Sequence, residues 1–210
     1  MGPEGGKAMR ENIRENLVTL REDGAVWDLV FTVDPLVVVG TKEEGGEYDL
    51  VPKHMAMPMG WENYFGFVCT PRHRTYHNAR REGAFTVSYP RPTQVVLASL
   101  AASPRKGDES KLAVDALPTF PASEVDGIFL EDGYLFLECV LDRTADDFGE
   151  NSLIIGRIVA AHAREDFLRA SERDDQDLIH ASPLLAYLNP GRYASIGESY
   201  SFPFPVGFMR

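Results

Sequence analysis

The sequence predicts a mainly β protein, an antiparallel β-barrel that is closed or partly open, with a few peripheral helices. A series of short runs rich in β-branched and aromatic residues follows the chain, separated by turn-forming residues. The helical segments do not alternate one for one with these runs, which argues against a doubly wound sheet. With 210 residues, the chain is long enough for one well-buried domain and too short for two of ordinary size.

The first part of the chain predicts a helix and then a hairpin. Met9, Ile13, Leu17 and Leu20 recur at helical spacing, so residues 7–22 are expected to form a surface helix. The period then changes to that of strands. The elements expected next are a strand over 35–41, a Glu-Glu-Gly-Gly turn with a second extended run, a strand over 63–70, a short helix ended by Gly83, and a strand over 84–90.

The second part predicts two long strands and a covering segment. The elements expected first are a short helix over 91–103 and a long loop over 104–126 with at most one short strand. A strand, an Asp-Gly turn and a long strand over 129–147 follow, and then a strong strand over 151–163. The last elements expected are a charged outer segment over 165–180, a short helix or turn over 182–188, and an extended aromatic tail. We expect three parts: an N-terminal helix or extension (1–28), the barrel domain (29–199) and the aromatic C-terminal tail (200–210).

Composition excludes several classes of protein. The net charge of −11 argues against a nucleic-acid-binding face, and any anionic ligand would need a local cluster of cations. No apolar run approaches the ~18 residues of a membrane span. The N-terminus lacks the apolar core of a signal peptide, so we expect a cytoplasmic protein. Cys69 and Cys139 lie in apolar runs and are expected to be buried and reduced, without a metal.

The common catalytic motifs are absent from the sequence. It contains no Gly-rich phosphate loop, no HExxH zinc motif and no GxSxG nucleophile elbow. The five histidines are scattered. Local sequence therefore assigns no catalytic residue and no metal site.

A cation-rich stretch follows the strand over 63–70. Arg72 and Arg74 come directly after the strand, Thr75 has the position of a helix N-cap or first-turn residue, and Asn78 lies one turn on. Free N–H groups at a helix N-terminus, a hydroxyl and two guanidinium groups together suit a phosphate. The ordinary alternative, a helix start with solvated arginines, is favoured by the pattern alone.

A second stretch, residues 49–66, interrupts two strands with polar, Met and Trp residues. Lys53 and His54 stand between a strand and the loop, and Met55, Met57 and Trp61 follow. These apolar residues form either a small satellite core or a lip on which a flat aromatic ligand lies. Sequence alone does not separate the two.

Both stretches, in this order, resemble the flavin-reductase-like FMN-binding split barrels. Residues 49–54 (DLVPKH) resemble the family's N-L-A-P-x-S segment, and residues 72–78 (RHRTYHN) resemble its K-D-T-x-x-N motif. The runs AFTVSYP, YLFLECVLDRT and LIIGRIVAAHA resemble later strands, and SPLLAYLNPGRYASIG resembles the closing segment. The likeness covers roughly residues 30–197.

The resemblance implies a split (Greek-key) barrel that forms a homodimer and binds FMN, with FAD as an alternative, near the subunit interface. It also implies NAD(P)H as co-substrate and a monooxygenase as a possible partner. By position, the isoalloxazine and ribityl chain would be lined by Pro52, Lys53, His54 and Met55. Backbone groups of Cys69 and Thr70 would lie beside the flavin. The phosphate would be held by Arg74, Thr75 and Asn78, assisted by Arg72.

Three departures from the family pattern affect the expected function. His54 replaces a small Ser or Thr, the segment Trp61–Tyr64 replaces a Pro-Pro entry, and Asn151-Ser152 replaces a His that many reductases carry. Three functions therefore stay open: an NAD(P)H-dependent flavin reductase or related oxidoreductase, a binding or electron-transfer flavoprotein that does not use NAD(P)H directly, and a scaffold that has lost flavin.

Overall fold

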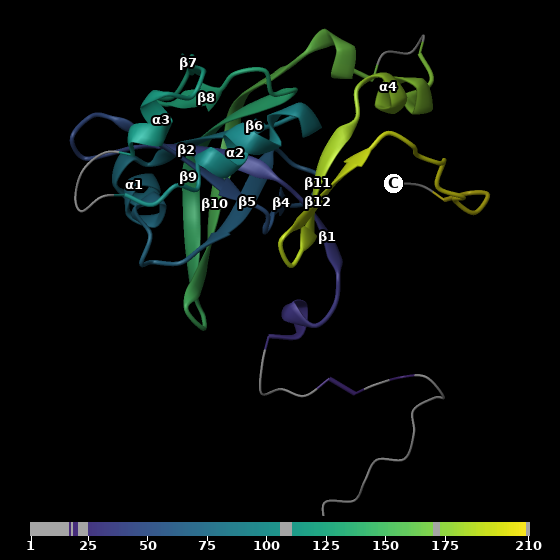
Figure 1. Ribbon diagram of the computed structural model, residues 1–210, viewed down its shortest axis with the longest axis horizontal. Coiled ribbons are helices and arrows are strands. Elements are labelled where there is room, and N and C mark those ends of the chain that lie inside the picture. Colours follow the sequence, from purple (N-terminus) through teal and green to yellow (C-terminus); the bar gives the residue numbers. More distant parts are fainter. Residues whose placement is uncertain (1–16, 18, 21–24, 106–110, 170–172, 209–210) are drawn as a thin grey trace, which may run out of the picture.

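A computed structural model describes residues 17, 19–20, 25–105, 111–169 and 173–208 (Figure 1). Its main feature is an antiparallel sheet of seven strands in the order β3-β2-β6-β9-β10-β5-β4. The strands are β2 (Val37–Lys42), β3 (Tyr48–Lys53), β4 (Ala56–Pro58), β5 (Tyr64–Cys69), β6 (Ala84–Tyr89), β9 (Leu135–Phe148) and β10 (Asn151–Ala163).

The two edge strands of this sheet are neighbours in the sequence. β3 and β4 lie at opposite ends of the strand order, yet only His54 and Met55 separate them. The sheet must therefore curl until its two edges approach each other. The result is a mainly β split barrel, which confirms the predicted fold class.

Smaller elements cover the barrel. A three-stranded sheet pairs β1 (Thr32–Pro35) with β11 (Leu184–Asn189) and β11 with β12 (Arg192–Ile196), and a two-stranded sheet pairs β7 (Thr119–Pro121) with β8 (Ile128–Leu130). The helices are α1 (Arg74–Glu82), α2 (Val95–Leu100), α3 (Leu112–Asp115) and α4 (Asp175–Ala181), with short 3-10 turns η1 (Val26–Asp28), η2 (Pro92–Gln94) and η3 (Glu165–Phe167).

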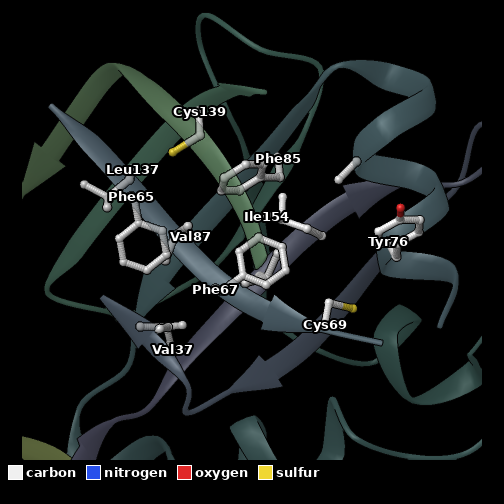
Figure 2. Packing of buried hydrophobic residues seen from close by; sticks show 13 residues of the cluster. Val37, Phe65, Phe67, Cys69, Tyr76, Phe85, Val87, Leu137, Cys139 and Ile154 are labelled. Carbon is white, nitrogen blue, oxygen red and sulfur yellow. The ribbon is translucent and has the colours of Figure 1, made fainter. Parts of the chain in front are cut away.

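Strand β2 is apolar along its whole length because both of its faces are covered. Val37 and Val39 belong to the cluster inside the barrel, which α1 closes with Tyr76 (Figure 2). Val38 points the other way, into a second cluster with Ala98 of α2. All three valines are fully buried. Burying one such side chain stabilises the fold by roughly 1.5–3 kcal/mol, which explains a strand without polar alternation.

Most predicted elements are confirmed, and two differ. Residues 112–115, in the segment predicted as a long loop, form the short helix α3. The hairpin β2–β3, the helix α1 and the long strands β9 and β10 form as expected, and Gly83 ends α1 in a left-handed conformation with φ of 66°. Residues 182–188 were expected to form a helix or turn, but 184–189 form strand β11, because pairing with β1 on one side and β12 on the other fixes the segment as a strand. The predicted helix over 7–22 lies outside the described residues, except for 17, 19 and 20, which are not helical.

Candidate functional site

The candidate site begins where the two edges of the sheet meet. Lys53 ends β3 and Cys69 ends β5, and the Lys53 Nζ lies 3.5 Å from the Cys69 Sγ. The turn of His54 and Met55 is held to β5 by a hydrogen bond that the Val68 N–H donates to the Met55 carbonyl, 2.8 Å long. Residues far apart in the sheet order are thus brought together at this seam.

Helix α1 starts directly beyond the seam. The His73 N–H donates to the Thr70 carbonyl at 3.0 Å, which turns the chain from β5 into the helix. His73 caps the helix without a side-chain hydrogen bond, and Arg74 and Thr75 form the first turn. The Thr75 side chain is buried and Arg74 is partly exposed. A helix start offers free N–H groups and a positive dipole end, which favour an anion.

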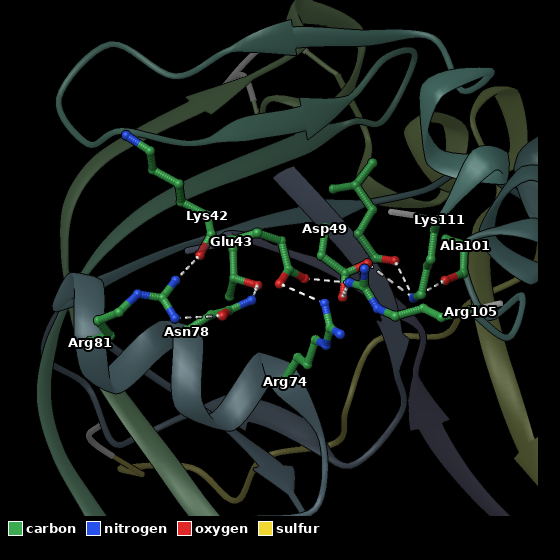
Figure 3. Close-up of polar contacts among 11 residues, drawn as sticks. Lys42, Glu43, Asp49, Arg74, Asn78, Arg81, Ala101, Arg105 and Lys111 are labelled. Atoms are coloured by element: carbon green, nitrogen blue, oxygen red, sulfur yellow. Dashed lines mark hydrogen bonds and ion pairs between the residues drawn. The ribbon is translucent and has the colours of Figure 1, made fainter. Parts of the chain in front are cut away.

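A cluster of ion pairs lies beside this helix start, along the edge strand β3 (Figure 3). Glu43 is paired with Arg74, at 3.6 Å between Oε2 and Nη1, and with Arg105. Asp49 is paired with Arg105 at 2.9 Å and with Lys111 at 3.0 Å. Both carboxylates are buried, so they hold the three cations in fixed positions.

Lys53 adds a fourth positive charge to this group. The pKa of His73 is lowered by burial and further by the charges of Lys53 and Lys111, which places both ammonium groups within electrostatic reach of the helix start. In this part of the described chain, four cations gather around two carboxylates. In a chain of net charge −11, such a local concentration of cations is the arrangement that an anionic ligand requires.

Two of the predicted site residues have other contacts. Arg72 forms an ion pair with the exposed Glu150, in the turn between β9 and β10. Asn78 is buried, donates to the Thr41 hydroxyl at 3.3 Å and accepts from Arg81 at 3.0 Å. The Asn78–Thr41 hydrogen bond joins the body of α1 to β2, and the Asn78–Arg81 bond lies within the helix.

The residues predicted to line the flavin ring fall on two faces. Lys53 points to Cys69 on the α1 side. His54 lies against Tyr187 of β11, with ring centroids 4.4 Å apart, and it lines a separate cavity together with Pro52. Met55 is exposed. The structure therefore groups Lys53, Cys69, Thr70, Arg74 and Thr75, and it separates Pro52 and His54 from them.

Sequence reasoning missed the second half of the cation cluster. Arg105 and Lys111 belong to the segment predicted as a long loop, to which the sequence assigns no site residue, and Glu43 and Asp49 lie in the β2–β3 hairpin. Lys111 also donates to the carbonyls of Ala101 (3.0 Å) and Leu50 (3.3 Å), and so fastens the segment after α2 to the edge of β3. The charged residues are visible in the sequence, but no sequence pattern predicts a contact between residues about sixty positions apart, such as Glu43 and Arg105.

Metal and membrane sites are not found in the described part of the chain. No three His, Cys, Asp or Glu side chains there are arranged to hold a metal ion. None of the described helices has the length and hydrophobicity of a membrane span.

Comparison with known proteins agrees with this architecture. A model of the flavin reductase like domain matches residues 32–197. The chain belongs to this family. No curated protein sequence matches the chain significantly.

Solved structures of this flavin-reductase-like fold superpose on most of the chain. Nitrilotriacetate monooxygenase component B from Bacillus cereus has a TM-score of 0.76 at 17% identity, covering 90% of this chain and 100% of that one. Flavoredoxin of Desulfovibrio vulgaris (Miyazaki F) has a TM-score of 0.73 at 21% identity, covering 91% and 100%. The FMN-binding protein from Thermus thermophilus, with bound p-hydroxybenzaldehyde, has a TM-score of 0.71 at 21% identity, covering 89% and 100%. These identities establish the fold alone.

Proposed function

We propose that this flavin-reductase-like protein binds FMN, with the phosphate at the start of α1. The observation that carries the proposal is the concentration of four cations, Lys53, Arg74, Arg105 and Lys111, around two buried carboxylates beside the helix start. A phosphate monoester carries about −1.5 to −2 charges at neutral pH. The positive charge and the N–H groups of the helix start therefore suit this anionic group.

The roles of the individual residues follow from their places. Arg74 and the N–H groups of the first turn of α1 would hold the phosphate, with Thr75 beside them. Lys53 and the backbone of Cys69 and Thr70 would lie along the ribityl chain and ring at the seam. Asn78 would act by fixing α1 on β2, and Arg72 would remain a peripheral contributor because Glu150 holds it.

The proposed reaction is transfer of a hydride from NAD(P)H to the flavin. The bound flavin would supply the redox chemistry, and the protein would orient it and exclude water from it. Because the flavin would supply the chemistry, the protein would need no acid–base pair, and none is recognisable in the sequence.

The test is a titration with FMN and with riboflavin, which lacks the phosphate. Arg74→Gln is expected to weaken FMN binding by about tenfold or more, the size of one lost charge-assisted hydrogen bond, and to leave riboflavin binding nearly unchanged. Arg157→Gln, an exposed arginine on β10, is the matched control. Equal affinity of wild type and Arg74→Gln for FMN would contradict the phosphate site. A parallel titration with FAD establishes whether the site also accepts the dinucleotide.

A second function is favoured by one observation on β10. Where many reductases carry a histidine, this chain has Asn151, which is exposed, and Ser152, which is buried. The protein would then be a binding or electron-transfer flavoprotein without direct use of NAD(P)H. Steady-state oxidation of NADH and NADPH with added FMN separates the two. Turnover supports the reductase, and photoreduction of bound flavin without turnover supports the alternative.

We further propose that the protein is a homodimer with the barrel domain over 29–199 flanked by an N-terminal extension and the tail. Large apolar side chains are exposed in the two end segments: Trp27, Leu29, Phe31 and Val33 near the start, and Tyr200, Phe202, Val206 and Phe208 near the end. Apolar exposure on this scale is typical of an interface. Sedimentation velocity tests the dimer, and a monomer at micromolar concentration would contradict it.

The expected setting is the cytoplasm, with a monooxygenase as a possible partner that consumes reduced flavin. Two free, buried cysteines suit a reducing compartment. Nucleic acid is not expected as a partner because the net charge is −11. A membrane is not expected because no apolar run of the sequence approaches the ~18 residues of a span.

A further inference from the structure

A cavity lies on the far side of β3 from the proposed phosphate site. It has a volume of about 360 Å³ and lies between helix α2 and the β11–β12 hairpin. One face of α2 and the residues after it supply Val95, Ala98, Ser99 and Ala102, which follow each other at helical spacing. Three of these side chains are small, and this leaves room between the helix and the hairpin.

The other walls are aromatic and apolar. Leu36 and Pro52 line the barrel side of the cavity. His54 and Tyr187 contact each other with ring centroids 4.4 Å apart and planes tilted by 30°. Planar rings and short aliphatic side chains together favour a flat, apolar ligand.

The Arg192 and His54 side chains at this cavity lack polar partners in the described chain, whereas the Tyr187 hydroxyl accepts a hydrogen bond from the Gly191 N–H at 2.9 Å. Within the described chain, the Arg192 guanidinium forms no ion pair, although it lines the cavity. The half-buried His54 ring likewise makes no hydrogen bond to another described residue, and burial lowers its pKa, so it is neutral at pH 7. Asp34 is the carboxylate that acts on His54, but it does not line the cavity. An unpaired guanidinium beside an apolar cavity selects a carboxylate.

We propose that this cavity binds a small aromatic carboxylate, with the ring between α2 and the His54–Tyr187 wall and the carboxylate on Arg192. The volume lies at the low end of the range for small-molecule pockets, which is roughly 300–1,000 Å³, and it suits one ring better than a dinucleotide. The binding does not depend on flavin. A role for this compound as electron acceptor rests on the proposed function.

The test uses benzoate and its neutral analogue benzamide, titrated calorimetrically into the full-length protein with and without FMN. Arg192→Gln is expected to weaken benzoate binding by about tenfold or more and to leave benzamide binding unchanged. Ser99→Leu, which fills the cavity from α2, is expected to abolish binding of both. Arg157→Gln and Thr93→Leu, two changes outside the cavity, are the matched controls and should bind both compounds like the wild type.

Three outcomes would overturn the inference. They are no benzoate binding by the wild type, equal benzoate affinity in wild type and Arg192→Gln, and displacement of benzoate by FMN in a competition titration. The last result would assign the cavity to the flavin itself and would leave the proposed flavin function standing. Loss of FMN binding without loss of benzoate binding, as expected for Arg74→Gln, would separate the two sites.

Discussion

The Lys53 Nζ and the Cys69 Sγ lie 3.5 Å apart across the seam of the barrel. Lys53 ends the edge strand β3, and Cys69 ends β5, which is next to the opposite edge in the seven-stranded order. The contact therefore exists only because the sheet is curled. It also places an ammonium group beside a buried thiol at the proposed flavin site.

The first prediction concerns the acidity of this thiol. Burial raises the pKa of Cys69, and the Lys53 charge and its hydrogen bond act in the opposite direction. Lys53→Met should therefore move the Cys69 titration to higher pH, as followed by 13C NMR of labelled cysteine. The signal of Cys139 serves as an internal reference, because burial raises the pKa of that thiol to about 12. Lys42→Met, whose ammonium pairs with Asp126, should leave Cys69 unchanged. An unshifted Cys69 midpoint in Lys53→Met would show that the contact is absent in solution.

A second prediction follows from the environment of His73. Its pKa is lowered by burial and then by Lys53 and Lys111, so the free protein holds His73 neutral at pH 7. A bound phosphate offsets those cations and raises the pKa of His73. Because the complex then binds more protons than the free protein, FMN affinity should increase as the pH falls from about 7.5 to 6.5, above the phosphate's own pKa of roughly 6.

Two comparisons isolate this effect. Riboflavin, which has no phosphate, should bind with little dependence on pH in the same range. His73→Gln should flatten the FMN profile, whereas His77→Gln, an exposed position on α1, should keep it. If FMN affinity changes with pH equally in the wild type and in His73→Gln, then His73 does not contribute to phosphate binding.

A third prediction separates positioning from direct binding. Asn78 is buried and joins Thr41 of β2 to Arg81. Asn78→Ala should lower the free energy of unfolding by about 1–3 kcal/mol, the cost of buried groups left without partners, and weaken FMN binding only modestly. Arg74→Gln should show the reverse pattern, since Arg74 is partly exposed. Urea unfolding and FMN titration of both variants distinguish a positioning residue from one that binds the phosphate directly. A strong loss of FMN affinity in a fully stable Asn78→Ala variant would make Asn78 a phosphate ligand.

The sequence predicted local structure well and long-range contacts poorly. The α1 start, Gly83 and the β2–β3 hairpin depend on neighbouring residues and were visible in the pattern. Lys53 lies on one face of β3, and Pro52 and His54 lie on the other, because successive side chains of a strand point to opposite faces. A sequence motif lists these residues together and does not predict that they separate. Arg105 and Lys111 join the site only through the fold. Strand β11 was missed because pairing on both of its sides, and not its own composition, determines it.

A buried carboxylate outside the proposed sites, that of Glu138, stabilises the β7–β8 part of the fold. Glu138 of β9 is fully buried. It accepts hydrogen bonds from the N–H groups of Ser123, Glu124 and Val125, from the Ser123 hydroxyl at 2.8 Å, and lies 3.0 Å from the His162 Nε2. The carboxylate thereby fastens the β7–β8 loop to the barrel. Burial alone would raise the pKa of Glu138, but the hydrogen bonds from Ser123, Glu124 and His162 outweigh it and lower the pKa to about 2.

The fourth prediction is that Glu138 makes the fold sensitive to acid. A carboxylate with a lowered pKa contributes its full stability above its unfolded value, and loses it as the pH falls toward the folded value. For a change from 4.5 to about 2, this contribution is on the order of 3 kcal/mol, lost between about pH 4.5 and 2. Glu138→Gln, which sets an amide against the same N–H donors, should lower the free energy of unfolding at pH 7 by a similar amount. It should also show a smaller further loss between pH 5 and 3 than the wild type. Glu124→Gln, an exposed change in the same loop, is the control, and chemical denaturation at each pH is the measurement. Parallel stability profiles for wild type and Glu138→Gln would mean that the loop is held by contacts other than this carboxylate.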